Sequence, residues 1–261
     1  MSSLKEQVHD YWNEEPCGTG LVTEKKYSPE YFEQLRRTRY EREPEIMEFA
    51  DFVRGRGKRV LEVGVGAGTD FAEWCRSGAE AHGVDLTEEG IAHTKTRLDA
   101  EQLSAASLRV GDAESLPHPD NHFDIVYSWG VIHHSPDTPR ALGELIRVAK
   151  PGGTIKLMVY HLDSPVSWVK WALHGMWRGK GRRWALAHHL ESPGTKAYTY
   201  EEIRRMCTVH PVHIKSLRAP LTYYDYLKVR GRAAQFFGHV LCGLLDSEHS
   251  GFFLQLELRK N

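Results

Sequence analysis

Three alternating glycines after a short apolar run are the clearest chemical signal in the chain. They are Gly64, Gly66 and Gly68, and the run Val60 to Val63 before them carries one acid, Glu62. A buried strand, a glycine turn and a helix start together predict a nucleotide-cofactor site, because glycine lets a ligand approach the backbone closely. A dinucleotide fingerprint would place its third glycine one residue later. A carboxylate beside the turn disfavours a diphosphate and favours a ligand with an ammonium group.

Two further acids follow the next two predicted strands. Asp85 closes a strand at 81–86, about 20 residues after the glycine turn, where an acid typically binds ribose hydroxyls. Asp112 follows a strand at 107–110. Because parallel strands end at the same edge of a sheet, these acids are expected to lie near the glycine turn.

Two later segments continue the alternating pattern. A fourth strand starts at Phe123 and ends near Ser128 and Trp129, and a Pro-Gly-Gly turn at 151–153 starts a fifth strand at 155–160. Helices are predicted between the strands, at 70–78, 88–102 and 137–149. Strands alternating with helices indicate a parallel sheet covered on both faces.

These signals, in this order over residues 58–160, resemble the class I S-adenosylmethionine-dependent methyltransferases, and within them the type 11 subgroup. The first motif of that family is Glu-x-Gly-x-Gly-x-Gly, which matches residues 62–68. The resemblance implies an α/β fold with a doubly wound, seven-stranded, mostly parallel sheet of the Rossmann-like type. It implies S-adenosyl-L-methionine as cofactor and S-adenosyl-L-homocysteine as product.

The resemblance also implies contacts for the cofactor. In the family, an acid at the position of Asp112 accepts from the adenine amino group, and the amide of the next residue, here Ala113, meets the ring. Outside the core, Tyr11 is expected to cover the cofactor, and Arg39 to pair with its carboxylate. The predicted cofactor-binding residues are Glu62, Gly64, Gly66, Gly68, Asp85, Leu86, Asp112, Ala113, Ser128, Trp129, Tyr11 and Arg39.

Methyl transfer from a sulfonium depends mainly on alignment and on exclusion of water. A base helps when the acceptor is a hydroxyl, a thiol or a protonated amine. Four side chains near the strand ends are candidates for this role: His133, His134, Tyr160 and His161. The alternative for each histidine is a structural role in its loop. No metal is expected, because the adjacent His188 and His189 lack partner acids and make a poor chelate.

The chain divides into three parts around the predicted core. Residues 1–57 are expected to be a helical N-terminal cap, with helices at 3–14, 29–41 and 44–55, and residues 58–160 the cofactor-binding core. Residues 161–261 contain a lid segment, defined as residues 161–198, and two completing strands at 212–217 and 252–258. In the resembling family these last strands form an antiparallel pair at one edge.

Composition excludes several other classes of protein. The 261 residues have a formal net charge of −1, so no global basic field indicates nucleic acid as a partner. The four cysteines form no Cys-x-x-Cys pair, which argues against a disulfide framework or a zinc knuckle. No signal core or membrane-spanning apolar run is evident, so a cytoplasmic location is expected.

The function predicted is therefore methyl transfer to a small organic acceptor, with oxygen favoured and nitrogen, sulfur or carbon open. One alternative is a quinone or lipid methyltransferase that docks on a membrane, because residues 168–184 are rich in tryptophan and arginine. A nucleic-acid enzyme is disfavoured, since the fourth strand ends Ser-Trp-Gly-Val. A non-catalytic sensor or partner subunit is disfavoured by the intact acids. The acceptor and the oligomeric state stay open.

Overall fold

The structure is a computed structural model that describes residues 2–226, 236, 239–240 and 242–261. Its centre is one twisted sheet with the strand order β3-β2-β1-β4-β5-β8-β7, and β6 pairs with β5 beside this path. The strands are β1 (Arg59–Val63), β2 (Glu80–Asp85), β3 (Ser107–Val110), β4 (Phe123–Trp129), β5 (Ala149–His161), β6 (Ala197–Tyr198), β7 (Val212–Arg218) and β8 (Phe253–Lys260).

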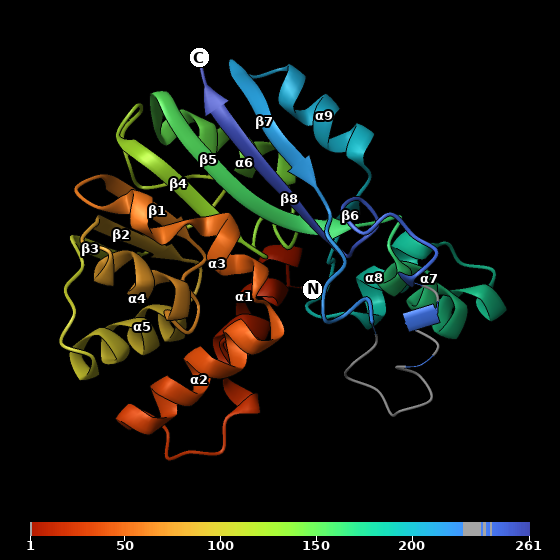
Figure 1. Ribbon diagram of the computed structural model, residues 1–261, viewed down its shortest axis with the longest axis horizontal. Coiled ribbons are helices and arrows are strands. Elements are labelled where there is room, and N and C mark those ends of the chain that lie inside the picture. The colour runs from red at the N-terminus through yellow and green to blue at the C-terminus, as the bar shows by residue number, and fades with distance from the viewer. Residues whose placement is uncertain (1, 227–235, 237–238, 241) are drawn as a thin grey trace.

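Helices cover both faces of the sheet (Figure 1). They are α1 (Leu4–Glu14), α2 (Pro29–Arg42), α3 (Glu45–Ala50), α4 (Thr69–Arg76), α5 (Glu88–Ala100), α6 (Thr138–Val148), α7 (Pro165–Lys170), α8 (Arg182–His189) and α9 (Tyr200–Thr208). Strands β1 to β6 pair in parallel, and β8 runs antiparallel to both β5 and β7. The doubly wound α/β fold and the antiparallel pair at one edge are confirmed.

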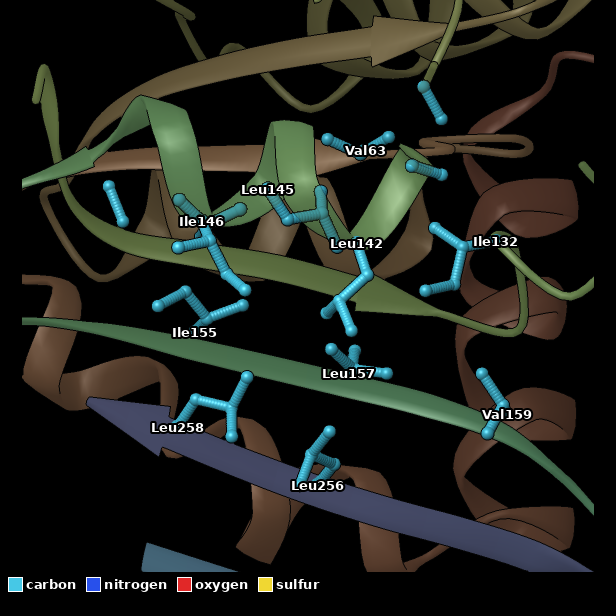
Figure 2. Packing of buried hydrophobic residues seen from close by; sticks show 14 of the residues in the cluster. Val63, Ile132, Leu142, Leu145, Ile146, Ile155, Leu157, Val159, Leu256 and Leu258 are labelled. Carbon is cyan, nitrogen blue, oxygen red and sulfur yellow. The ribbon is translucent and has the colours of Figure 1, made fainter. Parts of the chain in front are cut away.

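Two apolar layers hold the sheet between its helices. On one face, Leu142, Leu145 and Ile146 of α6 pack against side chains of β4, β5 and β8, and Figure 2 shows them interdigitating. On the other face, α3, α4 and α5 contribute a second buried cluster that includes Phe71 and Trp74. Burial of β1 and β4 on both faces explains why these strands are apolar along most of their length.

The predicted helix at 44–55 is wrong in its second half. Helix α3 ends at Ala50, and Asp51 adopts a left-handed conformation with φ of 53° before a short 3-10 turn at Phe52–Gly55. Aspartate tolerates this conformation better than most residues. The break lets both Phe49 and Phe52 enter the core, where both are buried.

The Pro-Gly-Gly segment does not precede the fifth strand but lies within it. Strand β5 starts at Ala149, which pairs with Phe123, and pairing resumes at Thr154 with Ile125. The extra residues of β5 between these pairs bulge out, and Gly152 takes a positive φ of 71° there. The turn chemistry was therefore correct, while the strand boundary was not.

The C-terminal third contains more regular structure than the sequence pattern indicated. Strand β6 and helices α7, α8 and α9 all lie between the fifth predicted strand and the last two. Helix α9 begins with a capping box between Thr199 and Glu202, and α1 begins with one between Ser3 and Glu6. Over the described residues, no helix has the length and apolar character needed to cross a membrane.

Candidate active site

The carboxyl ends of the parallel strands open into a cavity of about 420 Å³. Its walls come from the ends of β1, β2 and β4, from the loop after β3, from α1, and from the lid-segment residues Val166, Val169, Lys170, Leu190 and Glu191. Ligands of open parallel sheets bind at this edge. The predicted residues that line it are Glu62, Gly64, Gly66, Asp85, Leu86, Asp112, Ala113, Trp129, Arg39 and His134.

Two of the glycines shape the turn after β1 in different ways. Gly64 has φ of 83°, and a Cβ there would lie 2.2 Å from a methyl of Val131, so packing and backbone both exclude a side chain. Gly66 has φ of 50°, but a Cβ there would meet no atom within 4 Å. The space beside Gly66 belongs to the cavity, so this position leaves room for a ligand.

Asp85 ties the glycine turn to the end of β2. Its Oδ2 accepts from the Gly66 amide at 2.8 Å, and its Oδ1 accepts from the amide and the hydroxyl of Thr87 at 2.9 and 2.7 Å. A carboxylate offers about four acceptor positions. Three are used, so one stays available on a side chain that lines the cavity.

Asp112 has a partner that sequence reasoning missed. The ammonium of Lys5, on α1, lies 2.5 Å from Oδ2 of Asp112 and 2.7 Å from Oε2 of Glu114. The other oxygen, Oδ1, accepts from the Glu114 amide at 2.8 Å. Helix α1 therefore closes this end of the cavity through an ion pair, and Lys5 itself lines the wall.

Arg39 lines the cavity but is committed to Asp70. Its Nε and Nη2 donate to the two Asp70 oxygens, both at 2.8 Å, and the hydroxyls of Tyr40 and Tyr127 donate to the same carboxylate at 3.1 and 3.0 Å. Burial alone would raise the pKa of Asp70, but the guanidinium and these donors hold it below its usual value. The pairing of Arg39 with a cofactor carboxylate stays a prediction, and Asp70 is the partner that the sequence did not reveal.

Glu62 is a buried acid with an unused oxygen. Burial raises the pKa of Glu62 well above its usual value, and the nearby Asp70 carboxylate adds to the rise. Its Oε2 has no hydrogen-bond partner among the described residues. Leaving such an atom unpaired is costly. A donor that enters the cavity beside β1, such as an ammonium group, would satisfy it.

A polar group stands at the opposite end of the cavity from Asp112. The Tyr160 hydroxyl donates to Oε2 of Glu191 at 2.6 Å, and Nε2 of His134 lies 3.5 Å from the same oxygen. Burial raises the pKa of Glu191 and lowers that of His134 to about 3, so the imidazole is neutral. We call Tyr160, His134 and Glu191 the acceptor group.

Two hydroxyls contact Nδ1 of His134. The Ser192 hydroxyl oxygen lies 2.8 Å from Nδ1, and the oxygen of the Thr195 hydroxyl, which donates to the Ser192 carbonyl at 2.7 Å, lies 3.1 Å from it. Nε2 has no hydrogen-bond partner among the described residues. Nε2 of His134 and the Glu191 carboxylate therefore face each other at the cavity wall.

Aromatic rings surround the acceptor group. Tyr160 stacks on Phe252 with ring centroids 4.4 Å apart, and Trp12 of α1 meets His134 edge-on at 5.3 Å. A second acid, Glu43, accepts from the Trp129 indole at 2.9 Å and from the Tyr224 hydroxyl at 3.2 Å. This half of the cavity is therefore apolar, with its few polar atoms fixed in place.

Three of these side chains have the donor types of a metal site. His133, His134 and Glu191 each offer one ligand atom, and the atoms lie within 4.8 Å of one another. Imidazole and carboxylate donors suit zinc or iron. The sequence indicated only the adjacent His188 and His189, which make a poor chelate, so this cluster was not predicted from it.

Five predicted residues do not reach the cavity. A Cβ on Gly68 would collide with Thr94 of α5, so this glycine allows helix packing. The Ser128 hydroxyl donates to the Val63 carbonyl, and His161 bonds through Nδ1 to the Gly251 carbonyl. Two more have their side chains outside the lining: Tyr11, which packs on Trp12 and faces outward, and His133, which lies buried behind the ring of Tyr160.

Comparison with known proteins is consistent with this geometry. Residues 61–157 match the model of a family described as a methyltransferase domain. A phosphoethanolamine N-methyltransferase of Caenorhabditis elegans is 33% identical over 116 residues, which are 44% of this chain and 26% of that protein. A malonyl-[acyl-carrier protein] O-methyltransferase of Pectobacterium atrosepticum is 37% identical over 99 residues, 38% of this chain and 37% of that protein.

A solved structure extends the likeness to the whole chain at the level of the fold. Geranyl diphosphate C-methyltransferase of Streptomyces coelicolor, solved with Mg²⁺, geranyl diphosphate and S-adenosyl-L-homocysteine, superposes with a TM-score of 0.68. It covers 100% of this chain and 99% of its own, at 15% identity.

Fold, motifs and matches together define a class I S-adenosylmethionine-dependent methyltransferase domain. Within that class, residues 61–157 belong to the type 11 methyltransferases. The chain spans only 26% and 37% of the length of the two curated relatives above.

Proposed function

We propose that this chain moves the methyl group of S-adenosyl-L-methionine to a small organic acceptor. The observation that carries the proposal is one continuous cavity with two chemically different ends. One end gathers Glu62, Asp85 and Asp112 around the glycine turn, and the other presents the acceptor group among aromatic rings.

The residues of the first end fit the cofactor. The proposed contacts are Asp112 and Ala113 for the adenine, the free acceptor position of Asp85 for the ribose, and Glu62 with the turn at Gly64 for the amino-acid part. S-adenosyl-L-methionine carries no diphosphate, and the negative charge of these acids would disfavour a ligand that does. When bound, the cofactor supplies an activated methyl group on its sulfonium.

The second end is built for an acceptor that carries a proton. The Glu191 carboxylate accepts from the Tyr160 hydroxyl through Oε2, and a hydroxyl of the acceptor would donate to its other oxygen. Glu191 is a better base than His134, because burial moves its pKa upward, whereas the pKa of His134 falls to about 3. The acceptor proton would pass to Glu191, and the Tyr160 hydroxyl would stabilise the carboxylate beforehand.

Oxygen is the proposed acceptor atom, since a neutral hydroxyl offers one proton for the Glu191 carboxylate to accept. A protonated amine or a thiol would use the same base, and a carbon acid would need a stronger one. The aromatic walls exclude water from the reacting atoms and favour an acceptor with an apolar body.

The test is methyl transfer from isotope-labelled S-adenosyl-L-methionine to a metabolite extract, read by mass spectrometry of the labelled product. We expect one labelled small molecule whose methyl is bonded to oxygen, and no labelling with Asp85→Ala. Tight cofactor binding with no labelled product from any extract would contradict the proposal and favour a sensor or partner subunit.

A further inference from the structure

Residues 164–190 combine positive charge with tryptophan in a way that the rest of the chain does not. This stretch contains five Lys and Arg residues and no Asp or Glu, in a chain whose formal net charge is −1. Four of the seven tryptophans also lie here. The cations are Lys170, Arg178, Lys180, Arg182 and Arg183, and the tryptophans are Trp168, Trp171, Trp177 and Trp184.

Large apolar side chains of this stretch face away from the cavity. Trp177 is 84% exposed, and Trp168, Leu173 and Met176 are 40–49% exposed. They lie on consecutive helical turns between 165 and 178. Their neighbours Val166 and Val169 line the cavity instead, so this part of the lid segment has two apolar faces.

Such a surface is unusual for a protein in water. Folded proteins rarely leave several large apolar side chains exposed together unless something covers them. A second set of large apolar side chains is exposed in the C-terminal third, at Val240, Leu244 and Leu245.

The cations around Trp177 are available for a partner. Among the described residues, Arg178 and Lys180 make no ion pair with a carboxylate, and both are exposed. Arg182 pairs with Asp163 and lies over the Trp168 ring at 4.2 Å, and Arg183 pairs with Glu202. Two cations without a carboxylate partner among the described residues, Arg178 and Lys180, therefore follow the most exposed tryptophan closely in the sequence.

We propose that this outer surface of the lid segment docks on the headgroup region of an anionic lipid membrane. Tryptophan is favoured at that interface, lysine and arginine bind anionic headgroups, and aliphatic side chains enter the acyl boundary. A nucleic acid would also attract the cations and stack on Trp177. It would give no role to Leu173 and Met176, which have no aromatic face.

Docking would connect the membrane to the cavity wall. The segment that meets the bilayer carries Val166 and Val169 on its inner face and leads to Glu191 of the acceptor group. The proposal rests on the exposed surface alone and does not depend on methyl transfer.

The test is flotation of the full chain with phosphatidylcholine vesicles, with and without phosphatidylglycerol. We expect binding to the anionic vesicles that weakens with salt. The double variant Trp177→Ser/Leu173→Ser should lower the partition coefficient by about tenfold or more. Arg178→Gln and Lys180→Gln should each lower it by about fivefold.

The matched control is Val53→Ser/Val209→Ser, because these two valines are each 79% exposed outside the lid segment. The control should bind vesicles like the unchanged chain, and every variant should keep its affinity for S-adenosyl-L-homocysteine. Loss of vesicle binding in the control, or no binding by the unchanged chain, would overturn the proposal.

Two other results would also overturn it. A gel shift of single-stranded RNA that Arg178→Gln and Lys180→Gln abolish, without vesicle binding, would assign the surface to nucleic acid. Sedimentation showing a dimer that Trp177→Ser/Leu173→Ser converts to a monomer, again without vesicle binding, would assign it to a second copy of this chain.

Discussion

Replacing Arg39 with methionine separates two roles for this side chain, one in stability and one in cofactor binding. In the structure, Arg39 makes two hydrogen bonds to Asp70, whose carboxylate is almost fully buried. Removing one partner of a buried, hydrogen-bonded ion pair costs about 3–5 kcal/mol, because it leaves the other charge uncompensated. For a chain of this size, that corresponds to a fall in Tm of about 6–20 °C.

The stability that Arg39→Met loses should depend on pH. With Arg39 present, the folded-state pKa of Asp70 is below its unfolded value, so the ionised acid stabilises the fold above that unfolded pKa. Without Arg39, burial would raise the folded-state pKa. The variant would then lose stability as the pH rises, and its deficit against the unchanged chain should be smaller at pH 5 than at pH 8.

Calorimetric unfolding of two variants and a control completes the test. Asp70→Asn in the Arg39→Met background should recover part of the lost stability, since no buried charge remains. The matched control is Arg37→Met on the same helix, where Arg37 is largely exposed and lies 3.9 Å from Glu41, and its Tm should hardly change. The reasoning is refuted if Arg39→Met keeps its Tm and instead raises the KM for S-adenosyl-L-methionine tenfold, as the sequence-based role would require.

Four further predictions concern the cavity. Gly64→Ala should lower Tm more than Gly66→Ala does, because both glycines have a positive φ but only a side chain at 64 would also clash with Val131; Gly66→Ala should raise the Kd for S-adenosyl-L-homocysteine, and equal losses of Tm would contradict the geometry. Glu191→Gln should lower kcat by about 100-fold or more while leaving that Kd within about twofold, and an unchanged kcat would exclude Glu191 as the base. Because burial raises the pKa of Glu191, activity should fall as the pH drops through that raised pKa, and the fall should disappear from the residual rate of Glu191→Gln. Chelation and dialysis should leave activity unchanged, because alignment of the methyl donor and a carboxylate base require no metal; one bound metal per chain by elemental analysis would contradict this.

The residues around the glycine turn could be predicted from the sequence because each lies in a strand or close to its end. Glu62 lies in β1, the glycines follow that strand and Asp85 ends β2, and the parallel topology brings the strand ends together. The same logic placed Asp112 and Ala113 correctly at the cavity wall.

The residues that the sequence did not reveal depend on long-range packing. Lys5 reaches Asp112 across 107 positions, and Glu191 reaches Tyr160 across 31. Neither Lys5 nor Glu191 belongs to a sequence motif. Glu191 is the one acid in the sequence of residues 164–200, and that isolation was the signal available to find it.

Arg39 shows that an identified charge can have a partner that the sequence does not reveal. Its position near the cavity was predicted, but its two hydrogen bonds to the buried Asp70 were not. The helix break at Asp51 has a similar cause, because two phenylalanines on either side of it must both be buried.

Isothermal titration of the purified chain with S-adenosyl-L-homocysteine tests the central claim most directly. We expect one molecule bound per chain, with affinity lost in Asp85→Ala and no heat from NADH under the same conditions. Saturable binding of NADH together with no binding of S-adenosyl-L-homocysteine would contradict the assignment of the three acids to a phosphate-free nucleoside.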